Sequence, residues 1–244
     1  MKPFLILETG TPIPALRRHG GFGHWIRVAA GLSGRQARSC FVAAGEPLPS
    51  AGDYAGVLVT GSGAMVTDRS DWSERSADWL RDAAHAGLPL FGICYGHQLL
   101  AHALGGSVGY NPRGREMGTV PVAALADASA DPLFGGLGGQ FAAHTTHLQS
   151  VLAPPPQAAV LARSDRDDCQ AFRWGEATWG VQFHPEFSTR MMRGYIQARS
   201  DALRDEGTCH RTLLRDVKPA PTARRVLKRF IHAAHQRAHP RSKA

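Results

Sequence analysis

The most constraining feature of this sequence is a short apolar run that turns sharply into a helical pattern. Residues 88–94, LPLFGIC, are apolar without a break, as the buried strands of parallel sheets are. A helix-like pattern follows over 98–104, and the turn between the two reads GICYG, with Cys94 at its centre. Gly92 and Gly96 flank this cysteine, and residues without a side chain there let a strand and a helix pack closely. The pattern therefore places Cys94 at the carboxyl end of a buried strand.

The rest of the chain alternates between strand-like and helix-like segments. Strand-like segments cover 3–9, 37–45 and 56–62, and helix-like segments cover 15–32, which glycines interrupt, and 71–87. Such alternation predicts an α/β fold with a doubly wound, mostly parallel sheet and helices on both faces. After the GICYG turn, short strand-like segments follow one another with few helices between them. They predict a small additional antiparallel sheet beside the main one.

The C-terminal segment carries the net charge. The formal charge of the chain is +8, and from Arg211 to the end ten Lys or Arg accompany a single Asp. A basic helix, expected over 222–236, can bind nucleic acid or a membrane surface. Its apolar stripe favours a closing helix that docks on the sheet instead. The stripe consists of Val226, Leu227, Phe230, Ile231 and Ala234. We therefore expect one domain over 1–236 and a basic, disordered tail over 237–244.

The composition and the cysteine spacing limit where the protein is expected to be located and what it is expected to bind. No apolar run approaches the roughly 20 residues that cross a bilayer, and the N-terminal apolar run is too short for a signal peptide. The four cysteines lie far apart, without a CxxC pair or a Cys/His metal spacing. We therefore expect a cytoplasmic protein without disulfides, bound metal, cofactor or membrane partner.

A reactive cysteine needs a base, and the base needs a group that orients it. The segment GVQFHPEFS, residues 180–188, supplies His184 and Glu186. Residues i and i+2 of an extended segment face the same way, and Pro185 discourages a helix there. An imidazole and a carboxylate can thus point together from a strand end, at the rim where the GICYG turn opens. That turn also puts Cys94 at a helix N-terminus, which favours the reactive thiolate.

Attack by a cysteine on a carbonyl also requires donors for the negative charge that develops on oxygen. The backbone N–H of Tyr95, directly after the nucleophile, has this position in a strand–turn–helix elbow. A second donor is expected from the glycine-rich loop TGSGA, residues 60–64, which follows the third strand. In a parallel sheet that loop lies at the same carboxyl edge as Cys94. It has no Lys-Ser/Thr pair, so it is not a Walker phosphate-binding loop.

Together these segments resemble the class I, triad-type glutamine amidotransferases. More narrowly, they resemble a stand-alone subgroup similar to GMP-synthase-like amidotransferases and γ-glutamyl peptidases. The matching pieces, in the order of that family, are TGSGAMV, GICYGHQLLAHALGG, THLQSV and GVQFHPEFS. The resemblance covers roughly residues 3–236 and implies a flavodoxin-like fold. It also implies release of ammonia from glutamine through a γ-glutamyl thioester.

The resemblance assigns roles residue by residue. It implies that Cys94 is the nucleophile and that His184 is the general base, and then the acid for the departing amine. Glu186 is implied to orient His184. Gln98, one helical turn after Cys94, is implied to contact the amino-acid end of the substrate. The other substrate-binding counterparts are Gly61, Thr146, His147 and Gln149.

Two departures from the family pattern bear on the substrate. The oxyanion loop of the family usually reads Gly-Gly-Pro, and here it reads Gly61-Ser62-Gly63, so we expect the Ser62 N–H as the second donor. The aspartate of the family's Ser-His-Gly-Asp segment is replaced by Gln149, which changes the charge of the pocket. Glutamine is the leading expected substrate, and a γ-glutamyl peptide or conjugate is the alternative.

No ATP-binding loop or acceptor-binding segment follows the amidotransferase-like unit in this sequence. We therefore expect either a separate synthetase subunit that takes the ammonia or simple hydrolysis by water. A third alternative is a regulatory or nucleic-acid-binding protein that uses the basic C-terminal segment, with binding that weakens steeply in salt. A binding protein has no use for a cysteine, a base and an orienting group together, so catalysis is favoured.

Overall fold

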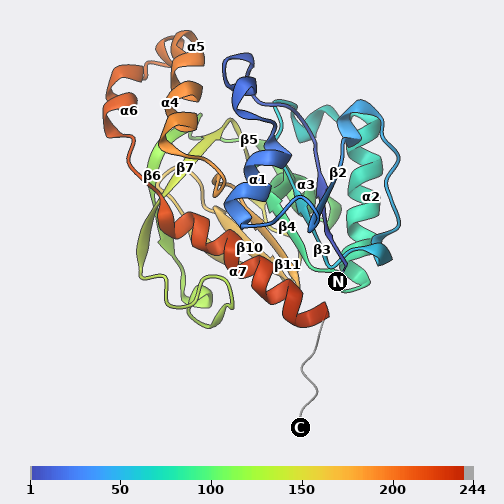
Figure 1. Cartoon of the computed structure of the whole chain (residues 1–244). Coiled ribbons are helices and arrows are strands. Elements are labelled where there is room, and N and C mark those ends of the chain that lie inside the picture. Colours follow the sequence, from blue (N-terminus) through green and yellow to red (C-terminus); the bar gives the residue numbers. More distant parts are fainter. Residues whose placement is uncertain (1, 239–244) are drawn as a thin grey trace.

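The computed structural model describes residues 2–238, which form a nine-stranded sheet with helices on both faces (Figure 1). Five neighbouring strands are parallel and lie in the order β2-β1-β3-β4-β11. These strands are β1 (Phe4–Leu7), β2 (Ala37–Cys40), β3 (Gly56–Val59), β4 (Leu90–Ile93) and β11 (Thr178–Val181). This order is the winding of flavodoxin-like folds. The predicted doubly wound α/β fold is confirmed.

Beyond β11 the sheet continues through four antiparallel strands. In spatial order these are β10 (Ala171–Trp174), β9 (Ala159–Arg163), β6 (Glu116–Ala124) and β7 (Gln140–His147). A separate two-stranded sheet pairs β5 (Ser107–Tyr110) with β8 (Gln149–Ala153). The predicted small antiparallel sheet is therefore present, while most of the short strands extend the main sheet. The sequence pattern does not indicate β8, because only Leu148 separates it from β7 and no glycine or proline marks the break.

The inner parallel strands β1, β3 and β4 are buried on both faces, which explains their unbroken apolar sequences, whereas the edge strand β2 exposes Arg38 and Ser39. All four residues of β1 are at most 1% exposed. Two helices cover one face, α1 (Phe22–Ala30) and α7 (Pro221–Ala238), and two cover the other, α2 (Asp71–His85) and α3 (Tyr95–Ala103) (Figure 1). On the α7 face the rings of Phe4 and Phe91 contact Phe230. On the α3 face Leu5 packs in one cluster with Leu99.

Three short helices form a group beside β6, at one end of the sheet (Figure 1). They are α4 (Thr189–Ala198), α5 (Ser200–Asp205) and α6 (His210–Asp216). Met192 and Tyr195 of α4 pack with Trp25 and Phe187 in a third apolar cluster. The sequence pattern does not indicate α5 and α6, because α5 buries only Leu203 and α6 buries no residue at all. The sequence prediction missed α4 although Met192, Tyr195 and Ile196 form its buried face. The junction of α4 and α5 is relevant to the site described below, because Arg199 at this junction lines the cleft beside Cys94.

The C-terminal helix docks on the sheet as its apolar stripe predicts. Val226, Leu227, Phe230, Ile231 and Ala234 are all buried. The helix extends to Ala238, so the first two residues of the expected tail are helical, and residues 239–244 lie outside the described part of the chain. Within residues 2–238, no helix is both long enough and apolar enough to cross a membrane.

Candidate active site

Cys94 is the residue at which the chain turns from β4 into α3. Its backbone angles are φ 54° and ψ −103°, outside the regions that residues with side chains favour. Strained backbone of this kind is concentrated at functional sites. The helix begins at Tyr95, earlier than the apolar periodicity starting at Gln98 predicts. The thiol therefore stands directly at the helix N-terminus, where it is 7% exposed.

Close backbone contacts require glycine at positions 92 and 96, on either side of Cys94. A Cβ atom placed on Gly92 would lie 2.3 Å from the carbonyl oxygen of Gly96. A Cβ atom placed on Gly96 would lie 2.6 Å from the carbonyl oxygen of Val59, on β3. Neither position leaves room for a side chain, because in both cases the obstacle is backbone. The spacing of the GICYG turn thus fixes how α3 sits against β3 and β4.

His184 and Glu186 come to the same edge because β11 is the neighbour of β4. The two strands are parallel, and Val181 is in register with Ile93, the residue before Cys94. The Nδ1–H of His184 donates to Oε1 of Glu186 at 2.8 Å. Both side chains are buried, at 3% and 0% exposure. Residues 184–187 form a turn, closed by the Phe187 N–H that donates to the carbonyl oxygen of His184 at 3.3 Å, and not the extended segment that the sequence predicts. This turn brings the imidazole and the carboxylate together.

Two further contacts position His184, one made by its ring and one by its backbone. It stacks on Phe187 with ring centroids 4.1 Å apart. Its backbone N–H donates to the carbonyl oxygen of His144 at 2.8 Å. Nε2 has no hydrogen-bond partner within residues 2–238. It is thus the one ring nitrogen left available on the side of Cys94 and a substrate.

Electrostatics couple the thiol to the imidazole. Burial raises the pKa of Cys94, but His184 and then His147 lower it, so the pKa lies below its ordinary value. Burial lowers the pKa of His184, but Glu186 and then Cys94 raise it, and it lies above its ordinary value. These directions favour a thiolate beside an imidazolium. By contrast, burial raises the pKa of the Cys169 thiol, as expected for an inert core cysteine.

The expected oxyanion donors lie beside this pair. Tyr95 is the first residue of α3, so its N–H has no acceptor within the helix. Ser62 follows β3, which is the other neighbour of β4, and it lines the same cleft as Cys94. Thr9 holds this loop, since its backbone N–H donates to Oγ1 of Thr60 at 3.0 Å and its hydroxyl shares its proton between the carbonyl oxygens of Thr60 at 2.9 Å and of Gly61 at 3.1 Å. Sequence reasoning missed this supporting role of Thr9.

The cleft beside Cys94 brings together most of the residues expected to bind substrate. Its lining comprises Ser62, Gly63, Ala64, Met65, Cys94, Tyr95, Gln98, Arg115, Thr146, His147, Leu148, Gln149 and Arg199. Gly61 lies behind the lining, where a Cβ atom would come 3.2 Å from Cε1 of His184. Arg115 and Arg199 were not indicated by any sequence motif. Arg199 enters the lining from the junction of α4 and α5.

The amide groups in the cleft are partly fixed and partly free. Nε2 of Gln98 donates to the carbonyl oxygen of Gln149 at 2.7 Å and to Oε1 of Gln182 at 2.9 Å. The side chain of Gln149 donates through Nε2 to Oγ1 of Thr67 at 2.5 Å. Oε1 of Gln149 and Oγ1 of Thr146 are buried without a hydrogen-bond partner among the described residues. Free acceptors of this kind suit an ammonium group.

His147 lies in the cleft wall, but its ring is engaged by the protein. Nε2 bonds Oε2 of Glu116 at 3.1 Å, and Nδ1 bonds the carbonyl oxygen of Gln149 at 3.0 Å. A carboxylate and a carbonyl only accept, so the ring donates from both nitrogens and is a cation. Burial lowers the pKa of His147, but Glu116 and Asp167 raise it above its ordinary value. The ring thus fixes the Gln149 backbone instead of presenting a free nitrogen to the cleft.

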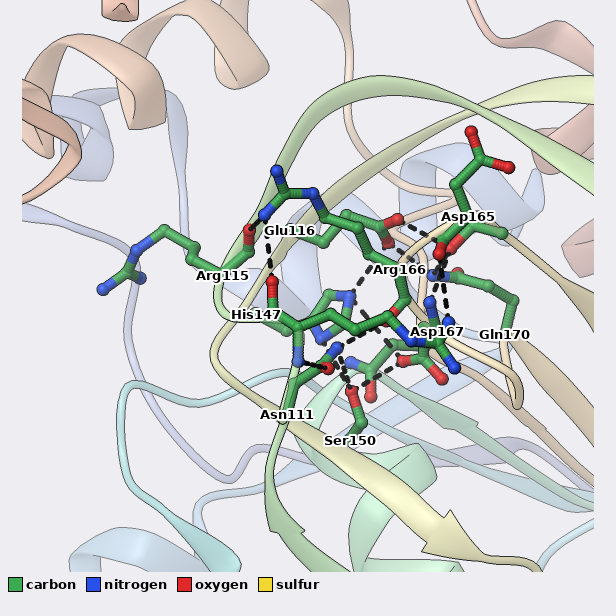
Figure 2. A network of polar contacts seen from close by, with 12 residues as sticks. Asn111, Arg115, Glu116, His147, Ser150, Asp165, Arg166, Asp167 and Gln170 are labelled. Atoms are coloured by element: carbon green, nitrogen blue, oxygen red, sulfur yellow. Dashed lines mark hydrogen bonds and ion pairs between the residues drawn. The ribbon is translucent and has the colours of Figure 1, made fainter. Parts of the chain in front are cut away.

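Figure 2 shows the buried network that holds this cation. Glu116, at the start of β6, accepts from Oγ of Ser164 and from Nε2 of Gln170, each at 2.6 Å. Asp167 accepts from Oγ of Ser150 at 2.8 Å and lies 3.8 Å from Nε2 of His147. The buried charges are therefore paired and hydrogen-bonded, as such charges must be. No sequence signal links these residues, because they come from separate segments.

Comparison with known proteins shows which proteins this chain resembles. Residues 35–200 match the family model described as "Glutamine amidotransferase class-I". A glutamine-hydrolyzing GMP synthase of Aeropyrum pernix is 40% identical over 145 residues, which are 59% of this chain and 26% of the relative. Gamma-glutamyl peptidase 5 of Arabidopsis thaliana is 28% identical over 193 residues, 77% of this chain and 76% of the peptidase. The matched parts span about a quarter of the length of the GMP synthases.

A solved structure supports the fold independently. The glutamine amido transferase of Methylobacillus flagellatus superimposes with a TM-score of 0.78 at 23% identity. The superposition covers 95% of each chain. At this level of identity the likeness bears on the fold alone, and it agrees with the doubly wound sheet described above.

Proposed function

Because this chain belongs to the class I glutamine amidotransferase family, we propose that it hydrolyses a γ-glutamyl amide bond on Cys94, with glutamine as the leading substrate. The observation that carries the proposal is the meeting of Cys94 with the His184–Glu186 pair at the ends of neighbouring strands. A strained cysteine at a helix N-terminus supplies a nucleophile. A buried imidazole oriented by a carboxylate supplies a base and an acid.

In the proposed first step, Sγ of Cys94 attacks the γ-carbonyl carbon of the substrate. The carbonyl oxygen becomes an oxyanion, which the N–H groups of Tyr95 and Ser62 stabilise. The proton on Nε2 of His184 then passes to the departing amine, and the C–N bond breaks. The products of this step are ammonia, or a larger amine, and a γ-glutamyl thioester on Cys94.

In the second step, water attacks the thioester carbon while Nε2 of His184 takes a proton from the water. Collapse of the second oxyanion breaks the C–S bond, releases glutamate and restores the thiolate–imidazolium pair. Glu186 keeps Nδ1 protonated through both steps, so that Nε2 is the atom that exchanges protons. The amino-acid end of the substrate would place its ammonium group at the free acceptors of Gln149 and Thr146.

A second candidate activity is that of a γ-glutamyl peptidase, which uses the same chemistry on a larger leaving amine. Two observations favour it. Gln149 stands where the family usually carries an aspartate, and the plant relative named gamma-glutamyl peptidase 5 matches along most of both chains. For glutamine, the partner that we propose is an ammonia-accepting synthetase. One relative, from Ignicoccus hospitalis, is itself a single subunit of a glutamine-hydrolyzing GMP synthase.

A substrate panel tests these activities. Purified protein is incubated with glutamine and with γ-glutamyl dipeptides, and glutamate and ammonia are measured. We expect glutamate from at least one compound and no turnover by Cys94→Ser. Cys209→Ser is the matched control, because Cys209 is exposed on another part of the surface. A protein that releases no glutamate from any compound would contradict the proposal, and a strong preference for glutamine would exclude the peptidase.

A further inference from the structure

Two arginines form one wall of the Cys94 cleft. Arg115 directly precedes β6, and Arg199 lies at the junction of α4 and α5. Both line the cleft together with Cys94, Gln98 and Gln149. In Figure 2 the side chain of Arg115 points away from the buried network around His147. The guanidinium of Arg115 therefore lies outside that network, which Arg115 joins only through its carbonyl oxygen, an acceptor for Nη1 of Arg166.

Arg115 and Arg199 differ in their ion-pair and hydrogen-bond partners. Nε and Nη2 of Arg115 each donate to Oε1 of Glu206, at 3.1 and 3.0 Å, which makes a two-pronged ion pair. Nε of Arg199 is buried without a hydrogen-bond partner within residues 2–238. Burial, and then the neighbouring Arg115, lower the pKa of Arg199, which is the direction expected for a cation held near a second cation.

The rest of the cleft does not compensate this charge. Among the described residues, its lining contains no aspartate or glutamate. The Cys94 thiolate is balanced by His184, and the His147 cation is balanced by Glu116. Arg199 makes no ion pair within residues 2–238, although Cys94 and Glu206, the carboxylate paired with Arg115, act to raise its pKa. A half-buried guanidinium in this state favours an anionic ligand, and the fork of N–H groups matches a carboxylate in particular.

We propose that Arg199, with Arg115 beside it, forms a carboxylate-binding subsite for γ-glutamyl substrates. The inference rests on the proposed function and makes it more specific. Two carboxylates can occupy the subsite. One is the α-carboxylate of the γ-glutamyl group itself, and the other is the carboxylate of the leaving amine in a γ-glutamyl amino acid. Both offer the same chemistry to the arginines, and the experiment separates them.

The test compares kcat/KM within two pairs of compounds that differ by one carboxylate. The first pair is glutamine and its α-carboxamide, and the second is γ-glutamylglycine and γ-glutamylglycinamide. In at least one pair the wild-type protein should prefer the acid by about 10- to 100-fold, the range of a charge-assisted hydrogen bond. Arg199→Gln should remove that preference by slowing the acid, and leave the amide within about threefold. The pair of compounds in which Arg199→Gln loses the preference for the acid identifies the carboxylate that the subsite binds.

Two further variants complete the test. Arg115→Gln should weaken the same preference, which guards against misfolding of a single variant. Arg193→Gln is the matched control, because Arg193 is an exposed arginine of α4 outside the cleft, and it should leave both preferences unchanged. Equal rates within both pairs for the wild type, or preferences that survive Arg199→Gln, would overturn the subsite.

Failure of the proposed function gives a different result, namely no hydrolysis of any compound. The subsite is then judged by binding alone. Binding of glutamate and of γ-glutamylglycine to Cys94→Ser protein is measured by calorimetry. Adding Arg199→Gln should weaken the binding of one of them by about tenfold or more. Unchanged or undetectable binding would contradict the subsite even in that case.

Discussion

The Nδ1–H of His184 donates to Oε1 of Glu186 at 2.8 Å, while Nε2 of the same ring has no partner within residues 2–238. This relationship fixes the tautomer of the imidazole and leaves one nitrogen for proton exchange. The adjacent Cys94 has its pKa lowered by the same ring. Most of the proposed chemistry follows from these three side chains.

Replacement of Glu186 tests the orienting role. Glu186→Gln keeps the size of the side chain but removes its charge and lets the ring adopt the other tautomer. We expect kcat on the preferred γ-glutamyl substrate to fall by about 10³- to 10⁴-fold, with a much smaller change in KM. Glu176→Gln, a change of an exposed glutamate, serves as the control. A loss of less than tenfold in Glu186→Gln would show that the pair is not catalytic.

The pH dependence of Cys94 alkylation tests the ion pair. Because the pKa of Cys94 lies below its ordinary value of 9.0, the thiolate should form as pH rises through that lower value. The iodoacetamide rate at Cys94, followed by peptide mass spectrometry, should therefore have its midpoint below pH 9.0. In His184→Ala, burial still raises the pKa of Cys94 and the larger of the two lowering influences is gone, with only His147 left, so the midpoint should move upward. A midpoint that does not move would rule out the coupling.

Replacement of Gly92 tests the strand–helix contact. Gly92→Ala puts a Cβ atom 2.3 Å from the carbonyl oxygen of Gly96, so α3 must shift. We expect the free energy of unfolding to fall by about 1–3 kcal/mol, and the rate of hydrolysis to fall with it. Gly34→Ala is the matched control, because a Cβ atom at Gly34 meets nothing within 4 Å. Equal stability of the two variants in urea would refute the packing argument.

Replacement of His147 tests the buried cation. His147→Gln leaves Glu116 and Asp167 buried without the imidazolium, which should cost about 3 kcal/mol of unfolding free energy. A raised folded pKa contributes stability that is fully present below the ordinary value of 6.5 and is lost as pH rises through the raised value. The difference in unfolding free energy between wild type and His147→Gln should therefore be largest near pH 6 and become smaller at higher pH.

The control for His147 is an exposed ion pair. Asp78→Asn breaks the contact of Asp78 with Arg81 on α2, where the side chains are 66% and 45% exposed. Pairs of this kind are worth roughly 1 kcal/mol or less. A difference between wild type and His147→Gln that stays constant between pH 6 and pH 9 would argue against a buried imidazolium.

Local patterns in the sequence predict the fold and the position of Cys94 at the end of a buried strand. The GICYG turn identifies a buried strand that ends at Cys94, because two glycines in that spacing serve close backbone contact. The sequence predicts the contact of His184 with Glu186 from an extended segment. The contact is present, but it is made by a turn over residues 184–187, in which the Phe187 N–H donates to the carbonyl oxygen of His184. Sequence alone does not say that β11 lies beside β4. The expectation that the two motifs share one rim rests on parallel strands ending at the same edge of a sheet, and the family resemblance adds that they act together.

Features built from distant segments could not be predicted. The expectation that His147 binds substrate rests on its motif, whereas its ring bonds Glu116 from β6 and the backbone of Gln149. The position of Arg199 depends on the junction of α4 and α5, and α5 buries only Leu203, so no apolar stripe marks where this junction lies. The charge of the cleft therefore became visible only in the structure.

The most direct test of the central claim is a search for the γ-glutamyl thioester on Cys94. Wild-type protein is quenched in acid during turnover and analysed by peptide mass spectrometry. We predict a mass increase equal to one γ-glutamyl group on the peptide that contains Cys94, and neither adduct nor glutamate release in Cys94→Ala. Continued glutamate release by Cys94→Ala, with no adduct on the wild-type cysteine, would contradict the account.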